Sequence, residues 1–303
     1  MTNQKEARRS SGAHRGLNRI RVGDVVIVII ISLLCLTCIL PFIHIISKSI
    51  SSNNAVLAQK VSLWPIDITF KAYESILRDG MLTNSMAYTV LVTVLFTVIG
   101  MIVTTCAAYP LSRSGFKGRT FFGFVIMFTM YFSAGLIPEY LLYKDLGLIN
   151  TMWVLVLPLC FAPYNMLIMR SFLKSTIPES LYEAAYLDGA SHLGTLVRIV
   201  LPLSKPILAT LSLFYAVGRW NAYADAKYFI RTKSLQPIMY LLSNMVLNTG
   251  TDAISMSEAA AVASTPEVLQ SAIIMFATIP ILLVYPFVQR YFVTGVMIGA
   301  VKG

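Results

Sequence analysis

The chain has 303 residues, of which 56% are hydrophobic and only 13% are charged, and its mean hydropathy is +0.71. Soluble domains carry about 25% charged residues, so this composition excludes a soluble enzyme, a disordered chain and a small disulfide-linked scaffold, and it indicates a polytopic membrane protein. The net charge of +10 does not indicate nucleic-acid binding, because the basic residues lie at the edges of apolar runs and not in a patch with interleaved aromatic residues.

Six apolar runs follow one another along the chain, each with the length expected of a transmembrane helix of about 20 residues. In chain order they are Val25–Ser47, Met86–Tyr109, Thr120–Pro138, Leu146–Met169, a run that starts after Lys205 and passes Arg219, and Val268–Gln289. The fifth run is short between its two charges, so we expect the long stem of Arg219 to snorkel toward the membrane surface. The sequence therefore predicts an all-α integral membrane protein with six transmembrane helices.

Basic residues are concentrated in every second connection between these runs. Residues 1–21 form a basic N-terminal segment, and three more basic residues follow the second run within 113–119. The segment after the fourth run and the C-terminal tail are also basic, so the positive-inside rule places both termini in the cytoplasm. The long segments 48–85 and 226–267 are then external, and both are large enough to dock another protein.

The sequence carries no recognisable catalytic or metal-binding motif. It has no G-x-x-x-x-G-K-[ST] phosphate-binding loop, no G-x-S-x-G and no H-E-x-x-H, and its four cysteines all lie in apolar runs. We therefore expect no catalytic residue, no metal site and no cofactor in this chain. The centres of the runs also lack Asp, Glu, Lys and Arg, which disfavours an ion-coupled carrier but leaves it open, because sodium sites can be built from carbonyls and hydroxyls.

The segment between the fourth and fifth runs, residues 171–204, carries the local signals of two helices. Pro178 suits the first turn of a helix, where its missing N–H group is not needed, and Gly189 suits the end of that helix. Ser191 is a favourable N-cap for a second helix that leads into the fifth run. We expect a cytoplasmic helix of about three turns over Pro178–Asp188.

The composition of this expected helix favours contact with another protein. Ala184 and Ala185 leave a low face that a partner's groove can approach closely, and Glu183 and Asp188 supply charges that a partner can pair with. An ordinary amphipathic loop helix is the alternative interpretation.

The spacing across this segment is similar to a known signature. It consists of Glu-Ala-Ala, three residues, Gly, nine residues and Ile-x-Leu-Pro, formed here by Glu183, Ala184, Ala185, Gly189, Ile199, Leu201 and Pro202. This pattern resembles the signature of permease subunits of binding-protein-dependent ABC importers. The resemblance implies a type I ABC importer permease fold over residues 22–303. It also implies that the helix with Glu183 and Asp188 is a coupling helix, which lies in a groove of a separate ATPase subunit.

Three further stretches resemble the carbohydrate-importer permeases, the group that contains the maltose-type second permease and the polysaccharide permeases of Firmicutes. They are Tyr109–Arg113, Gly218–Tyr223 and Gln289–Gly303. Pro110 departs from that group, which usually has alanine there, and we expect it only to end or kink the helix. The resemblance also implies that the tail, Thr294–Gly303, reaches toward the ATPase dimer.

The resemblance further implies the partners and the location of this chain. We expect it to pair, in the plasma membrane of a bacterium, with a second homologous permease, two ATPase subunits that bind ATP and Mg²⁺, and an extracellular solute-binding protein. Its expected role is the import of a sugar, in particular an oligosaccharide. ABC importers of peptides, amino acids or phosphate remain alternatives, as does an ion-coupled secondary carrier.

Polar and aromatic residues near the ends of the runs are candidates for a sugar path. They are Tyr131, Tyr164, Asn165, Trp220, Asn221 and Tyr223. Asparagine can bond sugar hydroxyls and aromatic rings can pack on apolar C–H faces, so this set suits a neutral sugar. In two-permease importers of this type the main sugar site can lie on the other permease, and the same residues can instead form an interfacial belt.

Overall fold

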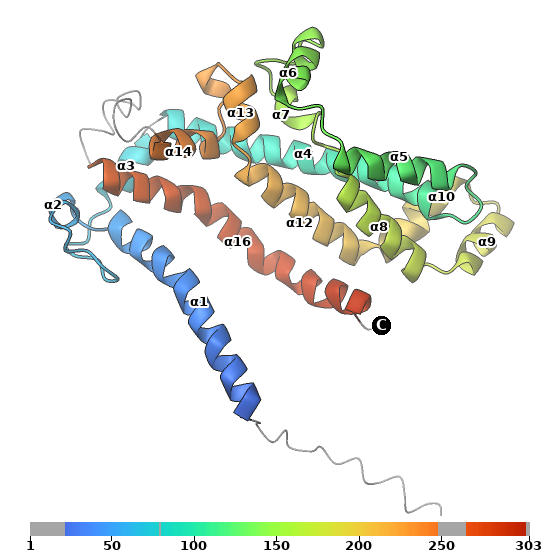
Figure 1. Ribbon diagram of the computed structural model, residues 1–303, viewed down its shortest axis with the longest axis horizontal. Helices are drawn as coiled ribbons and strands as arrows, with labels where there is room; N and C mark the ends of the chain where they lie inside the picture. The colour runs from blue at the N-terminus through green and yellow to red at the C-terminus, as the bar shows by residue number, and fades with distance from the viewer. Residues whose placement is uncertain (1–21, 79, 248–264, 301–303) are drawn as a thin grey trace, which may run out of the picture.

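The computed structural model describes residues 22–78, 80–247 and 265–300, with side chains described as far as Pro286. Every regular element in these ranges is a helix (Figure 1), which confirms the all-α fold. In chain order they are α1 (Val22–Ser49), α2 (Asn53–Leu57), α3 (Lys71–Arg78), α4 (Gly80–Ser112), α5 (Arg119–Tyr131), α6 (Leu136–Asp145), α7 (Trp153–Val156), α8 (Pro163–Thr176), α9 (Glu179–Leu187), α10 (His192–Thr195), the π-helix η1 (Leu196–Val200), α11 (Leu201–Leu203), α12 (Lys205–Asn221), α13 (Ala224–Phe229), the 3-10 helix η2 (Lys233–Leu235), α14 (Ile238–Leu247) and α16 (Pro266–Ala300).

Three of these helices, α1, α4 and α16, contain stretches that are long and apolar enough to cross a membrane. Two bent pairs pass the same test together: α5 and α6 are bent by 114°, and the helices over His192–Leu203 are bent by 85° from α12. The described residues thus hold three helices of spanning length, or up to five if each bent pair is one span.

The third and fourth predicted spans are both interrupted. Thr120–Pro138 is divided between α5, which ends at Tyr131, and the first turn of α6, and the chain turns at Gly135, whose φ of +88° is open to glycine at little cost. Leu146–Met169 is divided into α7 and α8, because Pro158 and Pro163 have no N–H group to donate to the preceding turn. An unbroken apolar composition does not reveal either interruption.

α4 is the central helix of the bundle, and both α8 and α12 pack along it (Figure 1). α16 packs against α12, and α1 leans on α16 with its apolar side chains exposed. Buried side chains of α4, α8 and α12 form a shared core that includes Ala108, Leu111, Met166, Met169, Leu173, Ile207 and Leu211. Lipid is as apolar as these side chains, so close packing is what holds the helices together.

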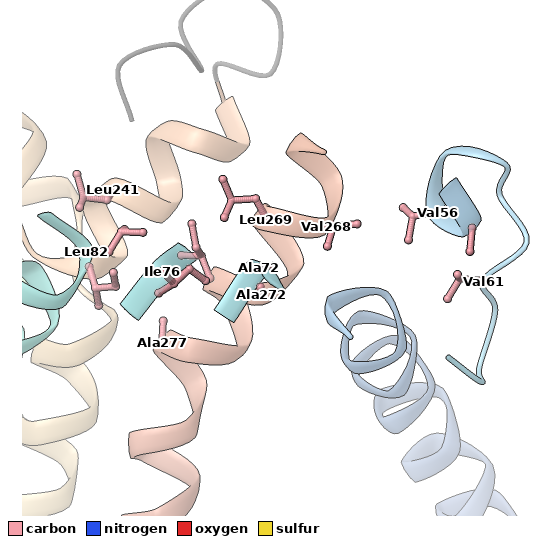
Figure 2. Packing of buried hydrophobic residues seen from close by; sticks show 13 residues of the cluster. Val56, Val61, Ala72, Ile76, Leu82, Leu241, Val268, Leu269, Ala272 and Ala277 are labelled. Carbon is pink, nitrogen blue, oxygen red and sulfur yellow. The ribbon is translucent and has the colours of Figure 1, made fainter. Parts of the chain in front are cut away.

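A second core closes the end of the molecule that holds α2, α3 and α14. Figure 2 shows Ala72 and Ile76 of α3 packed near Leu269 and Ala272 of α16, together with apolar side chains of α4 and α14. α2 and α3, which lie in the segment that we expect to be external, therefore form a folded cap on α16.

Arg219 does not snorkel, and that prediction is wrong. Its side chain is only 2% exposed, and its guanidinium forms an ion pair with Asp225, six residues further along the chain. The chain turns between α12 and α13 and brings this carboxylate back to the guanidinium. A paired charge can remain buried without reaching water.

Parts of the sequence prediction lie outside the described residues. These are the basic N-terminal segment 1–21, most of the external segment beyond residue 247, and the side chains of the tail Thr294–Gly303.

α4 continues through Pro110 and ends at Ser112, so this proline lies in the last turn of its helix.

Candidate functional site

α9 occupies the middle of the expected cytoplasmic segment. It spans Glu179–Leu187, with Pro178 directly before it in an extended conformation. Gly189 follows with a φ of +75°, and its N–H group closes the last turn. The next helix begins after Ser191, whose hydroxyl accepts a hydrogen bond from the Gly194 N–H at 3.1 Å. The caps read from the sequence therefore form in the structure.

The two faces of α9 differ in exposure. Tyr182 and Ala185 lie three residues apart on one face and are buried against the chain itself. The exposed side chains of α9 are those of Glu179, Ser180, Glu183, Ala184, Tyr186 and Leu187, and Asp188, directly after the helix, is also exposed. Of the two expected contact alanines, only Ala184 lies on the outer face. Ala185 lies on the inner face, because it packs on the same side of the helix as Tyr182.

Arg113, just beyond the end of α4, holds α9 in place. Its guanidinium carbon lies 3.5 Å from the centre of the Tyr182 ring, and its Nη2 atom lies 3.6 Å from the Glu179 carboxylate. The Ser114 hydroxyl donates a hydrogen bond to the same carboxylate at 2.7 Å. The negative face of the Tyr182 ring attracts the guanidinium cation, and burial raises the pKa of the Tyr182 hydroxyl above its ordinary value.

A hollow of about 750 Å³ lies between the end of α4, α9 and α10. Its lining includes Arg113, Glu179, Glu183, His192 and Leu193. A second hollow, of about 330 Å³, includes Glu183, Tyr186 and Leu187. Glu183 lines both hollows, so a protruding element of another protein seated in either one would meet its carboxylate.

The second half of the signature forms a joint. The π-helix η1 covers Leu196–Val200, and such turns are often found at functional sites. The chain then bends by 85° around Ser204 before α12 begins. Ile199 and Leu201 are half-buried at this joint, and Pro202 is exposed. The π-helix is a feature that the sequence motif does not indicate.

The candidate sugar-path residues occupy three places in the structure. Tyr164 and Asn165 lie in the first turn of α8, where Tyr164 is 60% exposed and Asn165 is buried. Asn221 and Tyr223 are exposed at the end of α12. Tyr131 ends α5 and is 87% exposed, and no ring contact or hydrogen bond among the described residues joins it to the other candidates.

Trp220 is placed differently from the other aromatic candidates. It is buried, and its Nε1 atom donates a hydrogen bond to the Ala277 carbonyl of α16 at 3.2 Å. It also lines an apolar groove of about 300 Å³ between α4, α12 and α16. Its indole group therefore ties α12 to α16, and only its apolar surface faces the groove.

Sequence reasoning missed a buried polar cluster between α4, α8 and α12. The Tyr215 hydroxyl lies 2.6 Å from Thr104 Oγ1, and Arg219 pairs with Asp225. Tyr215 and Arg219 are four residues apart and so share one face of α12. Two polar residues four positions apart within an apolar run were the feature of the sequence that could have indicated this cluster.

The chain is similar to known transport proteins over nearly its whole length. Residues 97–298 match the family described as binding-protein-dependent transport system inner membrane component. The chain is 39% identical to the Bacillus subtilis polygalacturonan/rhamnogalacturonan transport system permease protein YtcP, over 93% of this chain and 99% of that protein. It is 35% identical to the Bacillus subtilis protein LplC, over 93% of this chain and 96% of that protein.

A solved structure has the same fold. It is the crystal structure of a bacterial ABC transporter involved in the import of the acidic polysaccharide alginate, with a TM-score of 0.84 and 35% identity over 92% of this chain and 99% of the matched chain. This chain therefore belongs to the family of binding-protein-dependent transport system inner membrane components.

Proposed function

We propose that this chain forms one half of the membrane path of an ATP-driven importer, together with a second homologous permease. Two ATPase subunits that bind ATP and Mg²⁺ and an extracellular solute-binding protein complete the assembly. α9 carries the proposal, because the signature around Glu183 forms a helix with an exposed outer face and an inner face held to α4. A helix placed in this way is suited to enter a groove of an ATPase subunit.

Movement of an ATPase at α9 can reach the bundle by two connections. One is the contact of Arg113 with Tyr182 and Glu179, which leads to the end of α4. The other runs from Gly189 through the π-helix and the 85° bend into α12. Because α4 and α12 pack side by side, both connections act on one pair of helices. ATP and the loaded binding protein supply the differential binding that a change of state requires.

We further propose six membrane crossings with both termini in the cytoplasm. Helices α1, α4 and α16 support three of the crossings, and α5, α8 and α12 with their neighbouring turns support the others. α9 and α10 lie at one end of the bundle, and α2, α3 and α14 lie at the other end (Figure 1). The basic loop 113–119 accompanies α9, which agrees with a cytoplasmic location for that end.

Labelling of single cysteines tests this orientation. In a variant without the native cysteines, Trp64→Cys is expected to react with an impermeant thiol reagent on intact cells, because residue 64 is 82% exposed on the external cap. Lys174→Cys, at an exposed position in the last turn of α8, is expected to react only after the cells are permeabilised. The reverse pattern of labelling would invert the proposed topology.

The solute that we propose is an oligosaccharide, and chains of uronic acids are the first to test. The name of YtcP refers to polygalacturonan and rhamnogalacturonan, and the matched crystal structure is of an importer of acidic alginate. In this chain the candidate path residues are neutral, and Arg219 is already paired with Asp225. We therefore assign contacts with sugar hydroxyls and C–H faces to this chain, and recognition of carboxylates to other subunits.

Uptake by the assembled importer in proteoliposomes tests the function. With the binding protein and internal ATP, we expect uptake of labelled trigalacturonate or of raffinose, and no uptake of a tripeptide. Uptake of the tripeptide alone would contradict a sugar importer. Uptake that continues without ATP under a sodium or proton gradient would instead establish a secondary carrier.

A further inference from the structure

The interruption between α7 and α8 leaves backbone groups without their usual helical partners. In a continuous helix the Leu155 carbonyl would accept from residue 159, and the Ala162 N–H would donate to Pro158. The turn over residues 157–162 removes both bonds. Inside a membrane an unsatisfied backbone group is costly, so such a turn persists only where other groups replace the lost bonds.

α12 supplies both replacements from one face. The Ala162 N–H donates to the Tyr215 hydroxyl at 3.0 Å, and Arg219 Nη1 donates to the Leu155 carbonyl at 3.0 Å. Tyr215 and Arg219 are both only 3% exposed. Thr104 of α4 bonds the Tyr215 hydroxyl at 2.6 Å, so this group links three segments of the bundle.

The guanidinium of Arg219 is held in one orientation. Its Nη1 and Nη2 atoms both pair with the Asp225 carboxylate, with Nη2 to Oδ1 at 2.9 Å, and the Ala226 N–H also donates to Oδ1 at 2.9 Å. The planar fork of arginine allows this two-point pairing while Nη1 also reaches Leu155.

The turn is also closely packed against α4. A Cβ atom at Gly100 would lie 2.9 Å from the Cys160 carbonyl oxygen and 3.0 Å from the ring of Tyr215. Only glycine allows α4 to approach the turn this closely. The position of the turn is therefore set by Tyr215 and Arg219 on one side and by Gly100 on the other.

We propose that Tyr215 and Arg219 are positioning residues for transport. They hold the turn at residues 157–162 and thereby place Tyr164 and Asn165, in the first turn of α8, in the path of the sugar. This inference rests on the proposed function, because it places α8 beside the solute. Loss of the Tyr215 hydroxyl leaves α9 and its joint untouched, so ATP hydrolysis continues while the sugar is held less firmly in the path.

The test compares Tyr215→Phe with Tyr88→Phe in the assembled importer. Among the described residues the Tyr88 hydroxyl has no hydrogen-bond partner, so Tyr88→Phe removes an oxygen without removing a bond. We expect Tyr215→Phe to lower the amount of trigalacturonate or raffinose imported per ATP hydrolysed by about fivefold, the factor for one ordinary hydrogen bond. ATP hydrolysis stimulated by the binding protein should stay unchanged, and Tyr88→Phe should match the wild type. A parallel loss of uptake and hydrolysis, or no change, would overturn the proposal.

A second measurement does not depend on the sugar. In a variant without the native cysteines, spin labels on Leu159→Cys and Ile102→Cys, at positions 55% and 58% exposed, report the distance from the turn to α4. We expect this distance distribution to broaden in Tyr215→Phe. We expect it to shift in Gly100→Ala, a variant that keeps the Tyr215 hydroxyl. Gly100→Ala is the variant to measure if Tyr215→Phe does not assemble. An unchanged distribution in the variant that assembles refutes the positioning role, as does a changed distribution with unaltered import per ATP. If the wild type imports no sugar, the proposed function fails, while the distances still decide whether α12 holds the turn.

Discussion

Replacing Asp225 by asparagine is expected to destabilise the folded chain by about 3–5 kcal/mol, because it leaves the Arg219 guanidinium buried without a counter-charge. Both members of this ion pair are nearly inaccessible, with side-chain exposures of 2% and 11%. The expected result is a strong loss of assembled importer from the membrane and a Tm that is lower by roughly 10 °C in detergent. The measurements are the yield of the complex and its thermal unfolding.

An exposed ion pair in the same chain provides a matched control. Glu74 and Arg78 of α3 are 58% and 79% exposed, so Glu74→Gln makes the same chemical change where water can solvate the remaining charge. Such pairs contribute only about 0–1 kcal/mol, so this variant should assemble normally. If Asp225→Asn behaved like Glu74→Gln, the buried pair would have no structural role.

Changes at two positions of the signature, Glu183 in α9 and Gly189 just after it, are expected to separate the permease from its ATPase. Gly189→Val places a β-branched residue at a φ of +75°, a conformation that costs roughly 1–2 kcal/mol for an L-residue. No atom lies within 4 Å of a Cβ built there, so the effect is one of backbone conformation and not of collision. Glu183→Ala removes a charge-assisted contact worth about 1.5–3 kcal/mol if its partner is well placed.

Both variants are expected to reach the membrane, because neither residue lies in a spanning helix. A loss of about 1.4 kcal/mol corresponds to a tenfold weaker ATPase affinity, which co-purification and uptake assays can detect. Gly80→Val is the control for Gly189→Val, because the space around Gly80 is open and its φ is ordinary. Asp145→Ala is the control for Glu183→Ala, because it removes a negative charge at an exposed position away from α9. Full ATPase retention together with normal uptake in both test variants would show that α9 is an ordinary loop helix with no role in ATPase binding.

Much of the fold and part of the site could be predicted from local sequence. Apolar runs predict membrane helices because the bilayer imposes a length on each crossing. The ends of α9 could be predicted because a cap depends on the few residues around it, as Pro178, Gly189 and Ser191 show. The signature around Glu183 identified the family for the same reason, since its spacing is read along one continuous segment.

Prolines interrupt the fourth span, but tertiary structure decided how the freed backbone groups are satisfied and why Arg219 is buried. The Tyr215 hydroxyl is hydrogen-bonded to Thr104, which is 111 residues away in the sequence. Arg219 donates a hydrogen bond to the Leu155 carbonyl, which is 64 residues away. A backbone turn inside the membrane is stable only when distant groups satisfy its free N–H and C=O groups, and a charge stays buried only when its counter-ion is brought back to it. The face of α9 that is exposed was also decided this way, because Tyr182 is turned inward by Arg113 of another helix end. Sequence determined which local elements form and where prolines and glycine interrupt them, and packing between distant segments determined how those interruptions are stabilised and which side chains are exposed.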